Sequence, residues 1–183
     1  MIDFTFIEKL EGYRLEGYVP DAENSKSGMT IASGFDLGQR DAAEIKQAFP
    51  PSLAERLMSY VGFKGVAAQR FLDSHPLKIS EQEATLINQY AHGSAIKQLE
   101  DKWRTDCHYF PIQNFNDLGC ILQTVVASVA FQYGDLESRT PNYWQQVTTG
   151  DWPAALANLR NFGDRYPTRR NKEADLLESW LNV

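Results

Sequence analysis

Residues 25–38 read SKSGMTIASGFDLG and carry the clearest β-structure signal in the chain. Three glycines interrupt a short run of β-forming residues, a composition typical of strands joined by turns. We expect Met29-Thr30-Ile31 to form one short strand and Tyr18-Val19 another, with residues 21–28 as the turn between them. The sequence therefore predicts a small β-hairpin in the N-terminal part of the chain.

Helical patterns flank this hairpin on both sides. Residues 3–12 place Phe4, Ile7 and Leu10 at helical spacing, and Gly12 is a typical helix stop. After Gly38 the chain stays helical. Asp41 is expected to cap one helix, Pro51 to open the next, and a further helix is expected over residues 64–73. A long helix should run from the capping box Ser80-Glu81-Gln82-Glu83 to about Trp103, and another over residues 115–133. Asp151 and Thr168 are expected to cap the last two helices.

This order of elements predicts an α+β fold that is mostly helical, with a small β-hairpin lobe and a helical lobe. The chain has 183 residues, of which 43% are hydrophobic, so it can bury a sizeable core without metals or disulfides. We interpret residues 1–183 as a single domain. The β-containing lobe is placed at about 13–60, and the helical lobe at about 1–12 and 61–183.

Charge and cysteine content exclude several classes of function. The net charge is −6 and the pI about 5.1, which disfavours a nucleic-acid partner. No apolar run approaches the roughly 18 residues of a membrane span, so membrane insertion is not expected. Cys107 and Cys120 fit no metal-ligand spacing and are interpreted as thiols, with a disulfide as the alternative in an oxidising compartment. His75, His92 and His108 show no metal spacing either, so no cofactor is expected and we assign them structural or surface roles.

Acidic residues near the hairpin are the candidates for catalysis. Glu11 falls at the end of the first helix, on its apolar side, and partial burial favours the protonated form that a general acid needs. From the residues alone, Glu11 is either such an acid or an ordinary helix-end carboxylate. Asp36 is either a second catalytic carboxylate or the cap of a turn, and Thr30 fits a strand by its β-propensity.

An ordered set of motifs resembles the phage-type lysozymes, and residues 25–38 in particular resemble the muramidase domain of pesticin-like toxins. The remaining matches fall at the start, centre and end of the chain: Glu11-Gly12-Tyr13-Arg14-Leu15 with Tyr18, Ala130-Phe131-Gln132-Tyr133-Gly134, Trp152 with Ala155 and Asn158-Leu159, and Arg169-Arg170-Asn171-Lys172-Glu173. Ala32 departs from the family, which usually has glycine there, and any positive φ at this position would be strained.

The resemblance implies a lysozyme-like two-lobed glycosidase. It makes Glu11 the general acid that protonates the glycosidic oxygen, and Thr30 the residue that positions the attacking water. Asp36 becomes the second carboxylate, as general base or as stabiliser of the transition state. The phage pattern offers Asp21 as the alternative second carboxylate.

The resemblance also implies supporting roles in the helical lobe. Gln132 and Tyr133 would line the groove and bind N-acetyl sugars by hydrogen bonds. Arg169 would pair with Glu11 and tune its ionisation, with Arg170 as the alternative partner.

The predicted function is a lysozyme-type glycoside hydrolase that cleaves the β-1,4 bond between N-acetylmuramic acid and N-acetylglucosamine in peptidoglycan, as an antibacterial effector or bacteriocin-type toxin. The alternatives are a phage endolysin, a chitinase- or chitosanase-like enzyme, and a non-catalytic module that binds wall glycans or a partner. The sequence leaves an inverting or a retaining mechanism open.

The toxin interpretation carries expectations about partners and location. We expect a monomer with a cognate immunity protein. Residues 1–10 lack the long apolar run of a signal peptide. The chain is therefore expected to be made in the cytoplasm and carried by another system to the periplasm or cell wall of a target bacterium.

Overall fold

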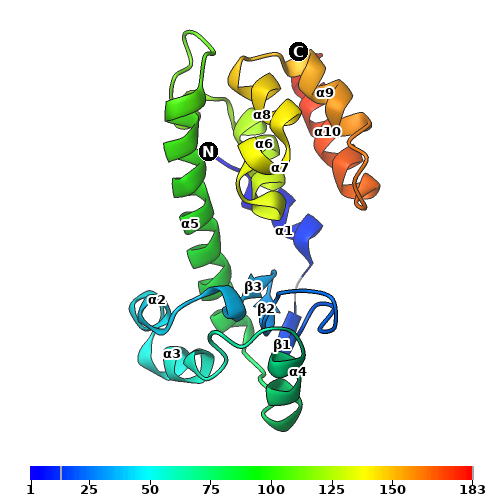
Figure 1. Cartoon of the computed structure of the whole chain (residues 1–183). Helices are drawn as coiled ribbons and strands as arrows, with labels where there is room; N and C mark the ends of the chain where they lie inside the picture. Colours follow the sequence, from blue (N-terminus) through cyan, green and yellow to red (C-terminus); the bar gives the residue numbers. More distant parts are fainter. Residues whose placement is uncertain (13, 183) are drawn as a thin grey trace. The chain divides into compact units, whose positions relative to one another are not determined.

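A computed structural model describes residues 1–12 and 14–182 of the chain, as ten α-helices, two 3₁₀-helices and a three-stranded sheet (Figure 1). The elements in chain order are α1 (Phe4–Glu11), β1 (Arg14–Tyr18), β2 (Thr30–Ala32), β3 (Phe35–Asp36), η1 (Leu37–Gln39), α2 (Ala42–Ala48), α3 (Pro51–Met58), α4 (Gly65–Ser74), α5 (Glu81–Asp106), η2 (Phe115–Asp117), α6 (Cys120–Tyr133), α7 (Leu136–Arg139), α8 (Pro141–Thr148), α9 (Trp152–Arg160) and α10 (Pro167–Leu181). The predicted α+β class with a helical majority is confirmed.

The chain divides into two compact units. The first unit contains Met1–Leu10 and Gly93–Val183, and the second unit contains Glu11–His92. The second unit is larger than the β-containing lobe expected at about 13–60. It reaches His92 because α4 contributes Leu72 to the same core as strand β2, and the start of α5 contributes Ala84 and Ile87. That the two units act as a single domain stays a prediction.

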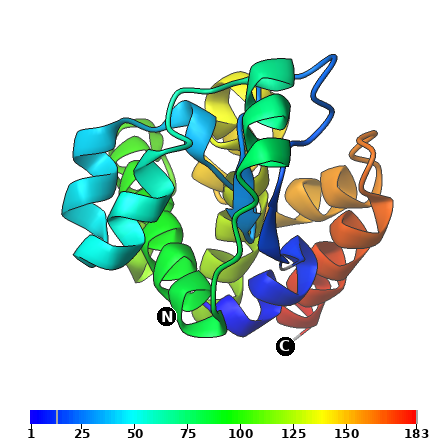
Figure 2. The same ribbon diagram turned by 90° about the horizontal axis from the view of Figure 1, so that it is seen from below.

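The sheet of the second unit is antiparallel in the order β1-β2-β3. The hairpin expected from the sequence has a third strand, β3, which pairs Thr30 with Asp36 and Ile31 with Phe35. β3 is only two residues long, too short for an alternating pattern to reveal it. Helices α2 and α3, drawn in cyan, lie beside each other and cover this core (Figure 2).

Two glycines bring distant segments of the second unit into backbone contact. A Cβ placed on Gly28 would lie 2.4 Å from the carbonyl oxygen of Phe63 and 2.5 Å from the Cα of Gly38. A Cβ on Gly38 would meet the Gly28 backbone at 2.7 Å. Since both obstacles are backbone, neither position has room for any side chain.

Ala32 ends β2 in a left-handed conformation. Its φ is +52°, and it is buried. A left-handed L-residue costs about 1–2 kcal/mol relative to glycine. The strain expected where the family usually has glycine is therefore present.

Helix termini in both units follow their sequence signals. The Asp41 carboxylate accepts a hydrogen bond from the Glu44 amide at 2.8 Å, and Asp151 accepts one from Ala154 at 3.1 Å. Ser80 and Glu83 form the reciprocal bonds of a capping box at the start of α5. Thr168 was the wrong cap for the last helix. α10 begins at Pro167, two residues before the start that a Thr168 cap implies, because the fixed φ of proline suits the first helical position.

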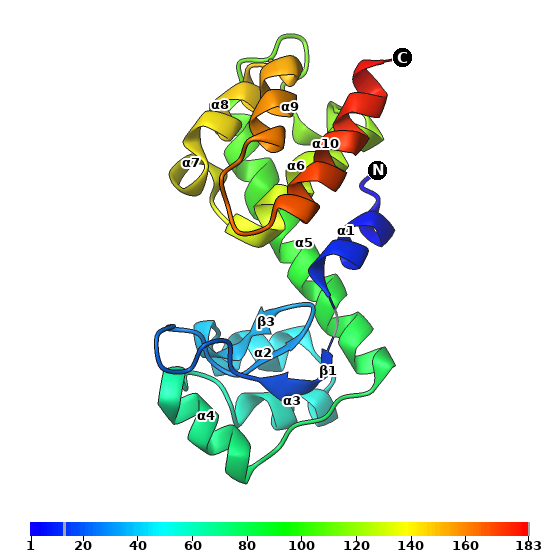
Figure 3. The same ribbon diagram turned by 90° about the vertical axis from the view of Figure 1, so that its right-hand side faces the viewer.

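The core of the first unit surrounds α6, whose residues 122–130 are all buried. α6 begins at Cys120 rather than at 115, because Phe115–Asp117 forms the separate 3₁₀-helix η2. α10 packs against α9 and α6 (Figure 3), and Trp103, Trp144 and Trp152 are buried in this core. Cys107 and Cys120 are both free thiols. Within the described residues, no helix combines the length and the apolar character needed to cross a membrane.

We predict that Gly28→Ala destabilises the protein by about 1–3 kcal/mol, because the methyl group would overlap backbone atoms that cannot move aside independently. Gly93→Ala is the matched control. Its Cβ would meet nothing within 4 Å, and alanine in helix α5 should stabilise by about 0.5–1 kcal/mol. Urea denaturation followed by circular dichroism measures both changes. Equal stability of the two variants would show that the Gly28–Gly38 contact is not tight.

Candidate functional site

Glu11 is the last residue of α1, and its carboxylate meets a histidine. Gly12 follows in a left-handed conformation, with a φ of +75°, and ends the helix. The Oε2 atom of Glu11 lies 3.3 Å from Nε2 of His92 on α5, and the two side chains are 9% and 10% exposed. The predicted shielding of Glu11 is therefore observed. Tyr13, which belongs to the motif that follows Glu11, lies outside the described residues.

Thr30 and Asp36 face each other across strands β2 and β3. They are direct partners in the register, so their Cβ atoms lie about 4.5–5.5 Å apart on the same side of the sheet. Thr30 is buried, and its hydroxyl donates a hydrogen bond to the carbonyl oxygen of Gly28 at 3.1 Å. The remaining lone pairs of the hydroxyl can accept a hydrogen bond from another group, such as water.

Asp36 is held by two backbone amides at once. Its Oδ1 accepts hydrogen bonds from the amides of Gly28 and Gly38, each at 2.8 Å. The bond from Gly38 caps η1, so the interpretation of Asp36 as a cap is confirmed, while its catalytic role stays a prediction. Two amide donors suit an ionised carboxylate, which accepts hydrogen bonds but has none to donate. Within residues 1–12 and 14–182 no hydrogen bond engages Oδ2, so this oxygen can accept a proton.

Asp21 belongs to a surface turn. It is exposed with a φ of +44°, and its carboxylate accepts a hydrogen bond from the Asn24 amide group at 2.9 Å. Its backbone oxygen accepts from the amides of Asn24 and Ser25. This explains Asp21 as a turn residue, since aspartate tolerates the left-handed region better than most residues.

Asn88 lies one helical turn before His92 on α5. It is buried, and its Oδ1 accepts a hydrogen bond from the backbone amide of Ser33 at 3.1 Å. Ser33 lies in the turn between β2 and β3. The same stretch of α5 therefore contacts both the Thr30–Asp36 hairpin and Glu11.

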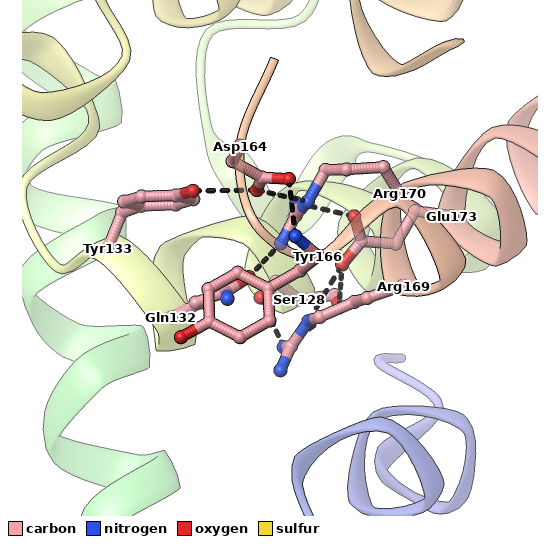
Figure 4. A network of polar contacts seen from close by, with 8 residues as sticks. All are labelled: Ser128, Gln132, Tyr133, Asp164, Tyr166, Arg169, Arg170 and Glu173. Carbon is pink, nitrogen blue, oxygen red and sulfur yellow. Dashed lines mark hydrogen bonds and ion pairs between the residues drawn. The ribbon is translucent and has the colours of Figure 1, made fainter. Parts of the chain in front are cut away.

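The four residues expected in the helical lobe form a second polar cluster, in the first unit (Figure 4). Glu173 lies between two guanidinium groups. It accepts from Arg169 Nε at 3.2 Å and from Arg170 Nη1 at 2.5 Å, and Ser128 also donates to it. Arg169 additionally donates to the carbonyl oxygen of Ser128 at 2.7 Å. The cluster ties α10 to α6.

Gln132 and Tyr133 complete this cluster. Arg170 donates to the Gln132 side chain, and the Tyr133 hydroxyl donates to Asp164 at 2.6 Å. Burial, the hydrogen bond to Asp164 and the Asp164 charge raise the pKa of Tyr133 to about 12. Both side chains therefore have partners within the first unit. Their predicted contact with sugar, and the predicted pairing of Arg169 or Arg170 with Glu11, stay predictions.

Buried charge in this cluster has an electrostatic cost. Burial raises the pKa of the Glu173 carboxyl, while Arg170, Ser128 and Arg169 oppose that rise. Burial likewise raises the pKa of Tyr143.

Among the described residues, no group of three or more His, Cys, Asp or Glu side chains is arranged to hold a metal ion.

A comparison with protein families shows to which family the chain belongs. Residues 1–153 match the family model for pesticin, described as a bacterial toxin homologue of phage lysozyme, C-terminal part. The chain belongs to this pesticin family. The match covers the segments that carry Glu11, Thr30, Asp36 and His92, and it ends before Arg169 and Arg170. A search of curated protein sequences finds no significant match.

Three residues of these clusters were missed from the sequence. His92 is buried against Glu11, a contact that the expected structural or surface role did not include. Asn88 and His92 share one face of α5 by their spacing, which was a usable signal for a pair. Glu173 was part of a recognised motif, yet nothing in the sequence indicated that it would be fully buried.

We predict that Glu173→Gln destabilises the protein by about 3 kcal/mol at neutral pH, because it leaves two guanidinium groups without their shared buried counter-ion. Glu178→Gln on the same helix is the control. Its partner Arg160 lies 2.8 Å away at the surface, where ion pairs contribute little. Thermal denaturation compares the two variants. An unchanged melting temperature for Glu173→Gln would mean that Glu173 is protonated in the folded protein.

Proposed function

We propose that this member of the pesticin family is a muramidase that hydrolyses the β-1,4 bond between N-acetylmuramic acid and N-acetylglucosamine in peptidoglycan. The observation that carries the proposal is the direct pairing of Thr30 with Asp36, whose carboxylate is fixed by two backbone amides. A hydroxyl and a fixed carboxylate side by side can bind and activate one water molecule. Membership of a family related to phage lysozyme supports peptidoglycan as the substrate.

The proposed reaction uses two carboxyl groups in different states. Protonated Glu11 donates its proton to the glycosidic oxygen as the bond from that oxygen to the sugar C1 breaks. A water molecule that donates hydrogen bonds to Thr30 and Asp36 attacks C1, and Asp36 Oδ2 takes the proton that the water loses. The Glu11 side chain is only 9% exposed and lies beside His92. The two amide hydrogen bonds hold the Asp36 carboxylate in place opposite Thr30.

Asp36 is the better candidate than Asp21 for the second carboxylate. Asp36 is paired with Thr30, whereas the side chain of Asp21 is engaged in its own turn with Asn24. The left-handed φ of Asp21 has a local explanation in that turn and needs no catalytic one.

The toxin family suggests a biological setting for this activity. The substrate would be the wall of a competing bacterium, reached in the periplasm or on the cell surface through a separate delivery system. An organism that makes such an enzyme would need an immunity protein that blocks the groove. Co-purification of the chain with the product of a neighbouring gene tests for that partner.

We predict that Glu11→Gln lowers the rate of reducing-end release from purified peptidoglycan by about 10²–10⁴-fold, the usual contribution of a general acid. Glu8→Gln is the matched control, because Glu8 lies on the same helix and is exposed. Both variants should fold normally by circular dichroism. Full activity of Glu11→Gln would disprove the assigned role. If the wild-type protein released reducing ends from chitin but not from peptidoglycan, its substrate would be chitin instead.

We predict that Asp36→Asn also lowers the rate by at least about 10²-fold while the fold persists, because asparagine keeps the Oδ1 acceptor but removes the base. Asp21→Asn is its counterpart and should keep wild-type activity, since asparagine also tolerates the left-handed turn. Melting temperatures check that both proteins are folded. The reverse pattern of activity would assign the second carboxylate to Asp21.

A further inference from the structure

We propose that Asn88 and His92 are positioning residues that fix the general acid relative to the hairpin that binds water. The proposal rests on the function proposed above, and it assigns a task to two residues of α5 for which the motifs gave none. It follows from contacts within the second unit, in which both residues and both of their partners lie.

The Asn88 contact fixes the hairpin. Its Oδ1 accepts from Ser33, the first residue of the turn between β2 and β3. The two register pairs of the hairpin, Ile31 with Phe35 and Thr30 with Asp36, follow directly from that turn. Movement of the turn would therefore displace Thr30 and Asp36 together.

The His92 contact fixes the acid. Its Nε2 lies 3.3 Å from Glu11 Oε2, and both side chains are about nine-tenths buried. A hydrogen bond at this place restricts the rotamers of the Glu11 carboxyl. Glu11 is the last residue of a short helix that is followed by glycine, and helix ends of this kind fray unless side-chain contacts hold them.

Helix α5 is a rigid support for both contacts. Residues four apart on a helix lie on the same face and about 6 Å apart along the axis. Ala84 and Ile87 bury the adjoining surface of α5 in the core, and the ring of Tyr90 packs edge-on against Phe35 of β3 with centroids 6.2 Å apart. The rotation of α5 relative to the hairpin is thus fixed by packing.

The burial of Asn88 and His92 indicates that these contacts matter. A buried amide or imidazole is costly unless it is hydrogen-bonded, and an apolar residue would fill a core position at lower cost. Each of the two side chains instead contacts an element that carries proposed chemistry, Ser33 beside the hairpin and Glu11 itself. A polar pair with these two partners is what a positioning role requires.

The test compares two amides of different length at position 92. In H92Q the side-chain amide can take the place of Nε2, whereas in H92N it is one methylene shorter and falls short of Glu11. We expect H92Q to keep kcat for peptidoglycan hydrolysis within about fivefold of wild type. We expect H92N to lose about 10²-fold in kcat with little change in KM, because a misplaced catalytic group slows the chemical step rather than binding.

Two further measurements keep the result interpretable. Introducing H92N into the Glu11→Gln protein should cause no additional loss, because His92 acts through Glu11. N88A removes the contact to Ser33 by an independent route, and it should also lower kcat without raising KM. Melting temperatures show whether each variant is folded. If H92N does not fold, the kcat of N88A tests the proposal.

The outcomes separate this proposal from the function on which it rests. Loss of activity in Glu11→Gln together with wild-type kcat in both H92N and N88A would overturn the positioning role and leave the muramidase assignment standing. Equal losses of kcat in H92Q and H92N would also overturn it, because the loss could then not be due to the hydrogen bond between residue 92 and Glu11. Full activity of Glu11→Gln would instead overturn the assigned acid.

Discussion

The two amide hydrogen bonds to Asp36 are the constraint on which the candidate site depends. They require the backbones of Gly28 and Gly38 to approach each other more closely than any side chain allows. That approach brings the loop before β2 against the segment after β3, and it fixes the carboxylate opposite Thr30. The glycines of this segment are therefore a requirement of the site geometry, because alanine at either position would force Asp36 away from one of its donors.

Local signals made much of the fold predictable. Asp41, Asp151 and the Ser80–Glu83 box form their expected caps because an N-cap needs only residues within one turn. The error at Thr168 had the same local origin, since two adjacent residues both favour a helix start and the proline prevails. β3 was not predicted because two residues are too few to show an alternating pattern. Only its pairing with β2 defines it as a strand.

The site was predictable only in part. Motif order pointed to Glu11, Thr30 and Asp36, and their catalytic roles stay predictions. The match to the pesticin family model spans residues 1–153, which include all three. The partners of His92 and Asn88 are 81 and 55 residues away in the sequence. The spacing of the two residues indicates a shared helix face, but it does not indicate which segments that face contacts. The cluster around Glu173 likewise depends on α6 and α10, which only the packed structure brings together.

The chemical identity of the new ends in digested peptidoglycan tests the central claim most directly. Soluble fragments are reduced with borohydride, and their reducing-end residues are identified by tandem mass spectrometry. A muramidase that uses water as the nucleophile leaves N-acetylmuramic acid at the reducing end, so N-acetylmuramitol is the predicted product. N-acetylglucosaminitol would contradict the bond assignment. A 1,6-anhydro product would contradict attack by a water molecule held between Thr30 and Asp36.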